Sequence, residues 1–120
     1  MARPLDLIVE EMLDYIEQAN SYVGAMTFGQ YSSDRKTQRA VERCIEVISE
    51  SSRHIPGEFT AKYPEIPWRD VAAIGYVFRH EYHNIAARIV WETVRLHLAP
   101  LEAAVRAIAA ELPPDDDEPA

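Results

Sequence analysis

Apolar residues recur at intervals of three and four along almost the whole chain, and this spacing constrains the fold more than any other feature. Such spacing places apolar side chains on one face of an α-helix, whereas a half-buried strand requires alternation. No convincing alternating segment is present in the 120 residues. The first predicted helix covers about 4–25, and its apolar stripe is formed by Leu5, Ile8, Met12, Ile16, Ala19 and Val23. The sequence therefore predicts an all-α protein.

The last predicted helix, about 85–112, has the most regular pattern. Asn84 can cap its start, and Pro100 lies inside it, so we expect a kink at the proline. Its apolar residues keep the four-and-three rhythm of a seam in an antiparallel bundle, and they are Trp91, Val94, Leu98, Leu101, Val105, Ile108 and Leu112.

Two further helices are predicted between these. One covers about 34–54 with Ser33 or Asp34 as its N-cap, and the other begins near Trp68 and runs to about residue 83. The segment "TFGQYSSD" breaks the helical pattern, and "HIPGEFTAKYPEIP" is expected to be a loop with room for one short helical turn. We therefore predict a single domain over 1–112, folded as an up-and-down bundle of four main helices.

The net charge of −8 is partly due to the last eight residues. The segment "PPDDDEPA", residues 113–120, is expected to be a disordered acidic tail, and the rest of the chain still carries −4 without its four carboxylates. Tight, nonspecific binding to a phosphate backbone is therefore not expected, and any RNA chemistry needs a local patch. No apolar run is long enough to span a membrane and no signal peptide is recognisable, so we predict a cytoplasmic protein.

Three residues that could carry chemistry are predicted to belong to the core. The lone Cys44 lies beside Val41 and Ile48 at helical spacing, which is typical of a small core residue. Trp68 and Trp91 could stack on bases, but their bundle-facing positions favour a role in packing.

The segment "FRHEYH", residues 78–83, concentrates polar chemistry on the third helix. Ala73, Ile74, Val77 and Phe78 can face the core of the bundle. His80 and His83 are then neighbours, and imidazole can donate and accept protons near neutral pH. No metal site is predicted, because zinc needs three or four ligands and "HEYH" lacks the spacing of HExxH. Spacing alone favours a solvated helix end.

The segment "FRHEYHNIAARIVWETVRLHLAPL" resembles the signature region of HepT-like proteins, within the larger group of HEPN helical domains. The resemblance is carried by His80, Tyr82, Ile89, Trp91, Thr93, Val94, Leu98, Pro100 and Leu101. Upstream, "YPEIPWRDVAAIG", "AVERCIEVISES" and "LDLIVEEMLDYIEQA" are similar to the family's other segments in consistent order. The resemblance covers most of residues 5–108.

The resemblance implies a HEPN-like bundle that forms a homodimer and cleaves RNA without a metal or other cofactor, through an Arg-x(4–6)-His-x-Tyr motif. His80 is then the general acid or base, Tyr82 a possible proton donor, and Arg79 and His83 supporting phosphate contacts. It also implies a type VII-like toxin–antitoxin pair, in which an MntA-like nucleotidyltransferase antitoxin transfers AMP onto Tyr82. The bulky anionic group would block the entry of phosphate.

The arginine of the motif is missing from its expected position. Four to six residues should separate it from His80, and at these positions the chain has Gly75, Ile74 and Ala73. Arg79 points about 100° away from His80 around the helix. Arg69 lies on nearly the same face but about 16 Å away along the axis. The resemblance therefore leaves open a catalytically inactive binding module that pairs with a nucleotidyltransferase.

A stripe of cations on the second helix is a second candidate for phosphate binding. Arg35, Arg39 and Arg43 recur at four-residue spacing and could hold the phosphates of RNA or of ATP. Ion pairs with Glu42 and Glu46 on a solvated face are the favoured interpretation. A substrate-binding subunit for a nucleotidyltransferase remains a third reading of the chain, and no sequence feature supports it.

Overall fold

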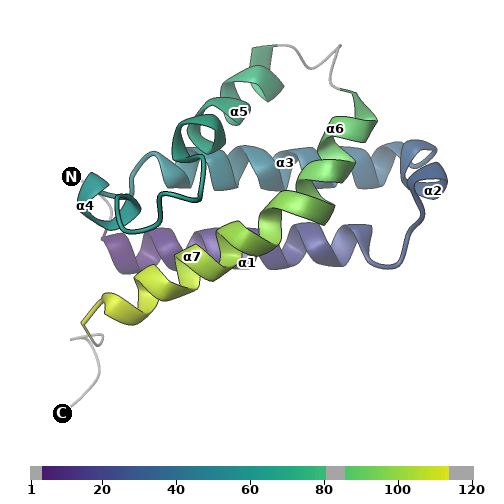
Figure 1. Cartoon of the computed structure of the whole chain (residues 1–120). Coiled ribbons are helices and arrows are strands. Elements are labelled where there is room, and N and C mark those ends of the chain that lie inside the picture. Colours follow the sequence, from purple (N-terminus) through teal and green to yellow (C-terminus); the bar gives the residue numbers. More distant parts are fainter. Residues whose placement is uncertain (1–3, 81–85, 114–120) are drawn as a thin grey trace.

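The computed structural model describes residues 4–80 and 86–113, and within these ranges it contains helices and no strand (Figure 1). The elements are α1 (Leu5–Val23), α2 (Phe28–Ser32), α3 (Arg35–Ser52), α4 (Gly57–Thr60), α5 (Trp68–His80), α6 (Ala87–Glu92), the π-helical η1 (Thr93–His97) and α7 (Leu98–Glu111). Four long helical segments alternate in direction: α1, α3, α5 and the α6–η1–α7 run. The predicted all-α bundle of four main helices is confirmed.

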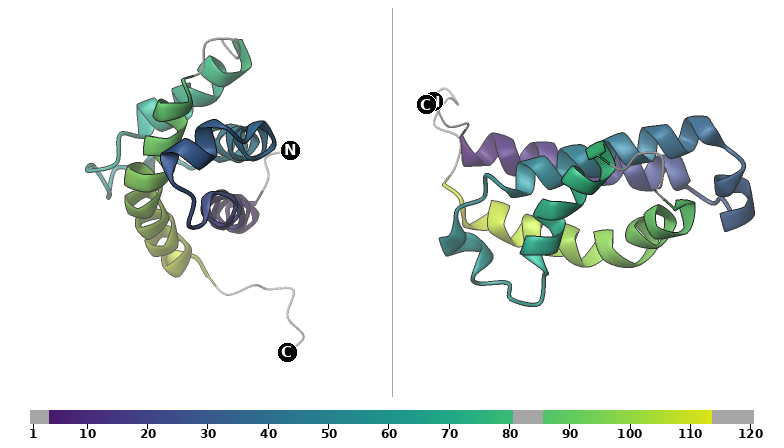
Figure 2. Two further views of the ribbon diagram at one scale, coloured as in Figure 1. Left: turned by 90° about the vertical axis from the view of Figure 1, so that its right-hand side faces the viewer. Right: turned by 90° about the horizontal axis from the view of Figure 1, so that it is seen from above.

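Helices α1 and α3 lie antiparallel and side by side (Figure 2), with α5 packed on α3 and α7 packed on α1. The apolar stripe of α1 is buried, and Met12 and Ile16 have no exposed surface. On the facing side of α3, Val41 and Ile48 are buried, and Cys44 between them is 2% exposed. This confirms Cys44 as a core residue, and its burial raises the pKa of the thiol to about 11, so it stays protonated at neutral pH.

Helix α2 corrects the prediction for "TFGQYSSD", which was expected to interrupt the helical pattern. Thr27 and Gln30 form a reciprocal capping box, in which the Gln30 N–H donates to Thr27 Oγ1 over 3.2 Å and the Thr27 N–H donates to Gln30 Oε1 over 2.9 Å. Tyr31 anchors the turn, with no exposed surface. Asp34, and not Ser33, then caps α3 by accepting from the Thr37 N–H over 3.0 Å.

Helix α5 begins after a loop that contains the short α4, as predicted for this segment. The indole N–H of Trp68 donates to the carbonyl of Tyr63 over 3.0 Å. Phe78 is 5% exposed, whereas Val77 is 40% exposed and Ala73 is also exposed. The prediction that Ala73 and Val77 face the core is therefore wrong. The reason is that α5 makes its extensive contacts with α3, whereas Ala73 and Val77 lie on a side of α5 that stays exposed.

The last helical run is interrupted by η1, where its axis changes direction (Figure 1). The predicted kink is confirmed, but the irregular segment lies just before Pro100, at Thr93–His97. The Leu98 N–H donates to the carbonyl of Thr93, five residues back, which is the pattern of a π-bulge. The run begins at Ala87, and the predicted cap Asn84 lies outside the described residues.

None of the described helices is long and apolar enough to cross a membrane. The predicted disorder of the acidic tail concerns residues almost entirely outside the described ranges, and the boundary of a single domain at residue 112 stays a prediction.

Candidate functional site

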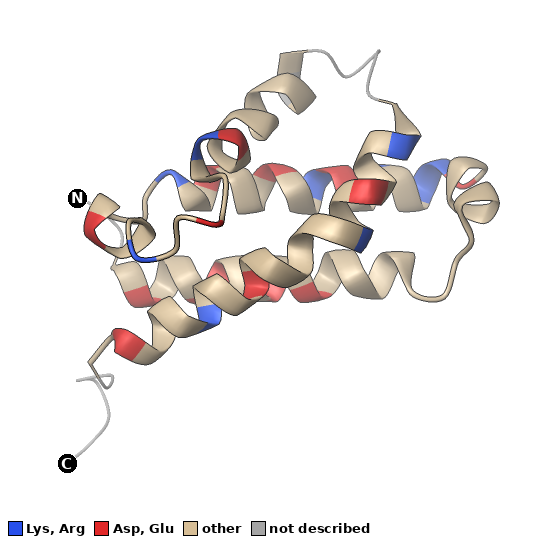
Figure 3. Ribbon diagram, in the orientation of Figure 1, with Lys and Arg blue, Asp and Glu red and all other residues tan. Residues whose placement is uncertain are grey.

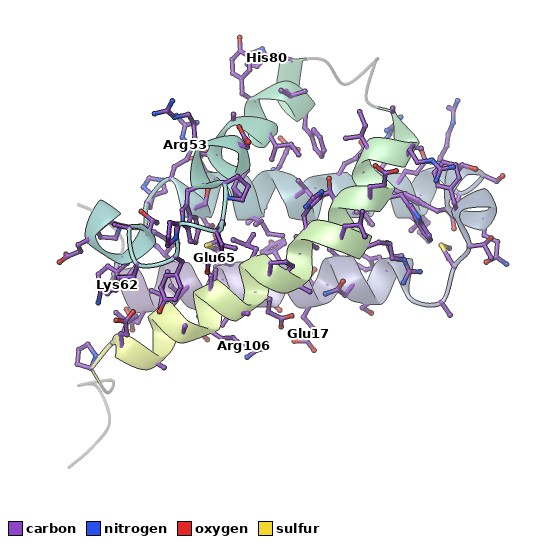
Figure 4. All side chains as sticks on the ribbon, viewed as in Figure 1. Glu17, Arg53, Lys62, Glu65, His80 and Arg106 are labelled. Carbon is purple, nitrogen blue, oxygen red and sulfur yellow. The ribbon has the colours of Figure 1, made fainter. Side chains whose placement is uncertain are left out.

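His80 is the last residue of α5 and its side chain is exposed at the upper tip of the helix (Figure 4). Its ring lies against that of Tyr76, with the ring centroids 4.0 Å apart and the planes inclined by 32°. The two residues are one helical turn apart, and Tyr76 is itself 58% exposed. The His80 imidazole is thus stacked on one neighbouring ring and remains exposed to solvent.

The other residues of the predicted cluster are not all described. Tyr82 and His83 lie outside the described residues, as does the side chain of Arg79, although its backbone belongs to α5. The structure therefore places His80 alone among the four.

Gly75, which stands where the family pattern expects an arginine, is buried against α3. Its N–H donates to Ser49 Oγ over 3.0 Å, and the Ser49 hydroxyl donates to the carbonyl of Ala72 over 3.0 Å. A side chain at position 75 would enter this contact between α3 and α5. The position is also about 140° around the helix from His80, so Gly75 serves the packing of α5.

The cations of α3 differ in how far they are engaged. Arg39 Nη1 lies 3.0 Å from Glu42 Oε1, and Arg43 Nη1 lies 4.0 Å from Glu46 Oε2, so both expected ion pairs are present. Arg35 and Lys36 are exposed, and neither has an ion pair within the described part of the chain. The start of α3 therefore presents two cations to solvent.

An aromatic cluster lies between α2 and α6, and sequence reasoning missed most of it. The Trp91 ring is 5.9 Å from Phe28 in an edge-to-face arrangement and 5.5 Å from Tyr31, measured between centroids. Trp91 is half-buried against the core, as is Trp68, in agreement with the prediction for both. The guanidinium carbon of Arg88 lies 3.9 Å from the centroid of the Phe28 ring, and that of Arg95 lies 4.6 Å from the centroid of the Trp91 ring.

A pocket of about 330 Å³ lies between α3, α5 and the η1–α7 segment. Its walls are mostly apolar, with Ile48 and Ile74 on facing helices, and Asp70 and His97 among its polar residues. His80 does not line it, so this hollow is separate from the candidate acid–base group. No group of His, Cys, Asp and Glu side chains in the described ranges is arranged to hold a metal ion.

Comparison with known proteins gives consistent matches. A family model described as "Ribonuclease HepT-like" matches residues 12–108. The chain is 34% identical over 94 residues to "Probable ribonuclease HepT" of Thermococcus cleftensis, which covers 78% of this chain and 86% of the relative. It is 31% identical over 100 residues to "Putative RNase TTE0752" of Caldanaerobacter subterraneus subsp. tengcongensis, which covers 83% and 89% respectively. No solved structure matches.

Proposed function

We propose a function that starts from the family of this chain, which belongs to the ribonuclease HepT-like family. In this proposal the protein is a metal-independent endoribonuclease and the toxin of a type VII-like toxin–antitoxin pair. The observation that supports this most directly is the exposed imidazole of His80 at the end of α5, in the His-x-Tyr sequence of the family. The proposal places the protein in the cytoplasm, where RNA and ATP are both available.

The proposed reaction is an internal transfer at a phosphodiester. One His80 takes the proton of a ribose 2′-hydroxyl, the 2′-oxygen bonds to phosphorus, and the bond from phosphorus to the 5′-oxygen breaks. A protonated group then gives its proton to the leaving 5′-oxygen. His80 of a second copy can supply that proton if two protomers meet at this site, and Tyr82 is the alternative donor. The products are a 2′,3′-cyclic phosphate and a 5′-hydroxyl.

Charge stabilisation must come from cations other than the missing motif arginine. Arg79 and His83 are adjacent to the His-x-Tyr sequence, and we assign them to the phosphate that reacts. Arg35 and Arg39 are assigned to flanking phosphates, with Arg39 having to exchange its contact with Glu42 for one with RNA.

Neutralisation is proposed to occur by transfer of AMP from ATP to the hydroxyl of Tyr82, with release of pyrophosphate, by an MntA-like nucleotidyltransferase. The added phosphodiester brings negative charge and bulk two residues from His80, which opposes the approach of a phosphate. Intact mass of the co-expressed pair tests this directly. A mass increase in units of AMP that disappears in Tyr82→Phe supports the proposal, and an unchanged mass contradicts it.

The ribonuclease itself is tested with His80→Ala and the matched variant His54→Ala. His54 is also exposed, but it pairs with Glu50 on α3 over 3.4 Å. His80→Ala should lower the rate of RNA cleavage by about 10²–10⁴-fold and remove growth arrest on expression, whereas His54→Ala should retain both. Cleavage should persist in a chelator.

The buried Gly75 favours a second candidate, a catalytically inactive bundle that binds a nucleotidyltransferase. This second function would be established by a wild-type protein that copurifies with the nucleotidyltransferase but neither arrests growth nor cleaves RNA at high concentration.

A further inference from the structure

The cations of this acidic chain are concentrated at one end of the molecule. Residues 24–41 and 86–97 hold five of its twelve Lys and Arg residues but only two of its twenty carboxylates. These segments form α2, the first turns of α3, α6 and η1, and α2, α3 and α6 contact one another. Figure 3 shows the blue segments of α3 and α6 at the end where α2 lies. This region is termed the basic end, and its cations are Arg35, Lys36, Arg39, Arg88 and Arg95.

The carboxylates within the basic end leave most of these cations free. Asp34 is engaged as the cap of α3, where its two oxygens accept from the backbone N–H and the hydroxyl of Thr37 over 3.0 and 2.8 Å. Arg35, Lys36 and Arg88 are exposed, and none of them forms an ion pair within the described ranges. Three exposed cations without a close ion pair in the described ranges therefore come from two different elements, α3 and α6, and of these Lys36 also interacts with the carboxylate of Asp34 at longer range.

Aromatic rings hold two of the arginines in place. The guanidinium carbon of Arg88 lies over Phe28, 3.9 Å from the ring centroid, and Phe28 is half-buried. Arg95 lies over Trp91 and donates to the carbonyls of Gly24 and Met26 over 3.1 and 3.0 Å. Stacking on a ring restricts the guanidinium before any ligand binds, so less conformational entropy is lost on binding.

We infer that the basic end is a docking surface for single-stranded RNA, outside the site that contains His80. Lys36 and Arg35 contact phosphates, and the stacked pair of Arg88 and Phe28 offers a base a flat surface. The inference rests on the proposed ribonuclease function, which it extends by assigning a surface that holds the substrate strand. Arg88 follows His80 by eight residues, so their backbones are at most about 29 Å apart. A strand bound at the basic end can therefore reach the imidazole.

Two features favour RNA over an acidic protein surface. First, the exposed cations come from different elements, so a charged strand can pass across all of them. Second, an arginine stacked on an aromatic ring suits an unpaired base, because every base has a flat face. The remainder of the chain carries an excess of carboxylates, which repels a polyanion and restricts it to this end.

Binding and cleavage are separated by using two versions of one oligonucleotide. A fluorescent 2′-O-methyl oligouridine of about twelve nucleotides lacks the nucleophile, so its anisotropy measures binding alone. The double variant Lys36→Ser/Arg88→Ser should weaken binding by roughly three- to tenfold. It should also reduce the slope of log affinity against log salt by about 0.7, the value for the one phosphate contact to a single strand that is lost with Lys36.

The matched control is Arg53→Ser/Arg106→Ser, which removes the same charge from two exposed positions, one directly after the end of α3 and one on α7. Its affinity should remain within twofold of the wild type. Equal losses in both double variants, or no loss in the first, would overturn the inference, and so would an effect of the first variant on partner binding alone. If an RNA with ordinary ribose is bound in the predicted way but never cut, the proposed ribonuclease activity is contradicted, whereas the docking surface is still supported.

Discussion

Gly75 is one of the positions at which the resemblance to the HepT-like motif leads us to expect an arginine, and its surroundings explain why a glycine is present. The backbone N–H at this position is bonded to Ser49 Oγ, and the residue is buried between α3 and α5. We therefore expect Gly75→Arg to lower the free energy of unfolding by about 1–3 kcal/mol or more, because a long cation must enter a packed contact. Chemical denaturation measures the change.

Ala73→Arg is the control for this variant. Ala73 is exposed, and it lies seven residues before His80 on nearly the same face of α5. Its substitution should change the stability by less than about 0.5 kcal/mol. A Gly75→Arg protein as stable as the wild type would show that the contact between α3 and α5 tolerates a side chain, contrary to the packing argument.

Tyr31 offers a test by pH, because its buried hydroxyl has no hydrogen-bond partner among the described side chains and backbone. Burial, and to a smaller extent the nearby Glu42, raises the pKa of Tyr31 from its ordinary value of 10.0 to about 12. A raised pKa stabilises the folded state below pH 10, and this contribution is lost as the pH rises from about 10 through 12. Tyr31→Phe should be at least as stable as the wild type at pH 7 and should lose less stability above pH 10, measured by denaturation across that range. Parallel losses for both proteins would contradict this.

The five-residue helix α2 depends on its cap, since isolated helices of this length are not stable in water. Thr27→Ala removes the hydroxyl that accepts from the Gln30 N–H, and we expect it to lower the free energy of unfolding by about 1 kcal/mol. The loss should extend to the aromatic cluster, visible as a change in Trp91 fluorescence, because α2 positions Phe28 and Tyr31 against that ring.

Ser21→Ala provides the comparison for this element, since Ser21 is an exposed residue of α1. Its effect should stay within about 0.5 kcal/mol. If Thr27→Ala and Ser21→Ala have the same free energy of unfolding, the capping box contributes nothing measurable, and the burial of Tyr31 alone holds α2.

Periodicity predicted the long helices because each of them buries a stripe repeated over three or more turns. It failed for α2, where five residues are too few to show a period and the element is held by a cap and by one buried ring. It also failed for Val77. An apolar residue on an amphipathic helix is expected to face the core, and the sequence does not show that α5 packs mainly on α3.

For the candidate site, the local sequence is not sufficient. The spacing within residues 78–83 favours a solvated helix end, and His80 is selected only through the family resemblance, which covers most of residues 5–108. The stacking of Arg88 on Phe28 joins residues sixty positions apart, and no pattern in either segment indicates that contact. The buried role of Gly75 likewise depends on Ser49 of another helix.

In the molecule as a whole, helix α5 has an exposed apolar side next to His80. Tyr76 is 58% exposed and Val77 is 40% exposed, on the helix that carries His80. If two protomers meet there, Val77→Glu places a charge in the interface, and a buried unpaired charge is strongly unfavourable. We expect this variant to shift a dimer to a monomer in light scattering coupled to gel filtration, and to lose RNA cleavage in parallel, because the general acid and the general base would then be separated.

Leu7→Glu is the matched change on a different face, since Leu7 of α1 is an apolar residue of 46% exposure. It should leave both the molar mass and the cleavage rate of the protein unchanged. A Val77→Glu protein that remains dimeric and active would show that α5 does not form the interface. A wild-type protein that cleaves RNA as a monomer would require both proton transfers to occur within one chain, which leaves Tyr82 as the partner of His80.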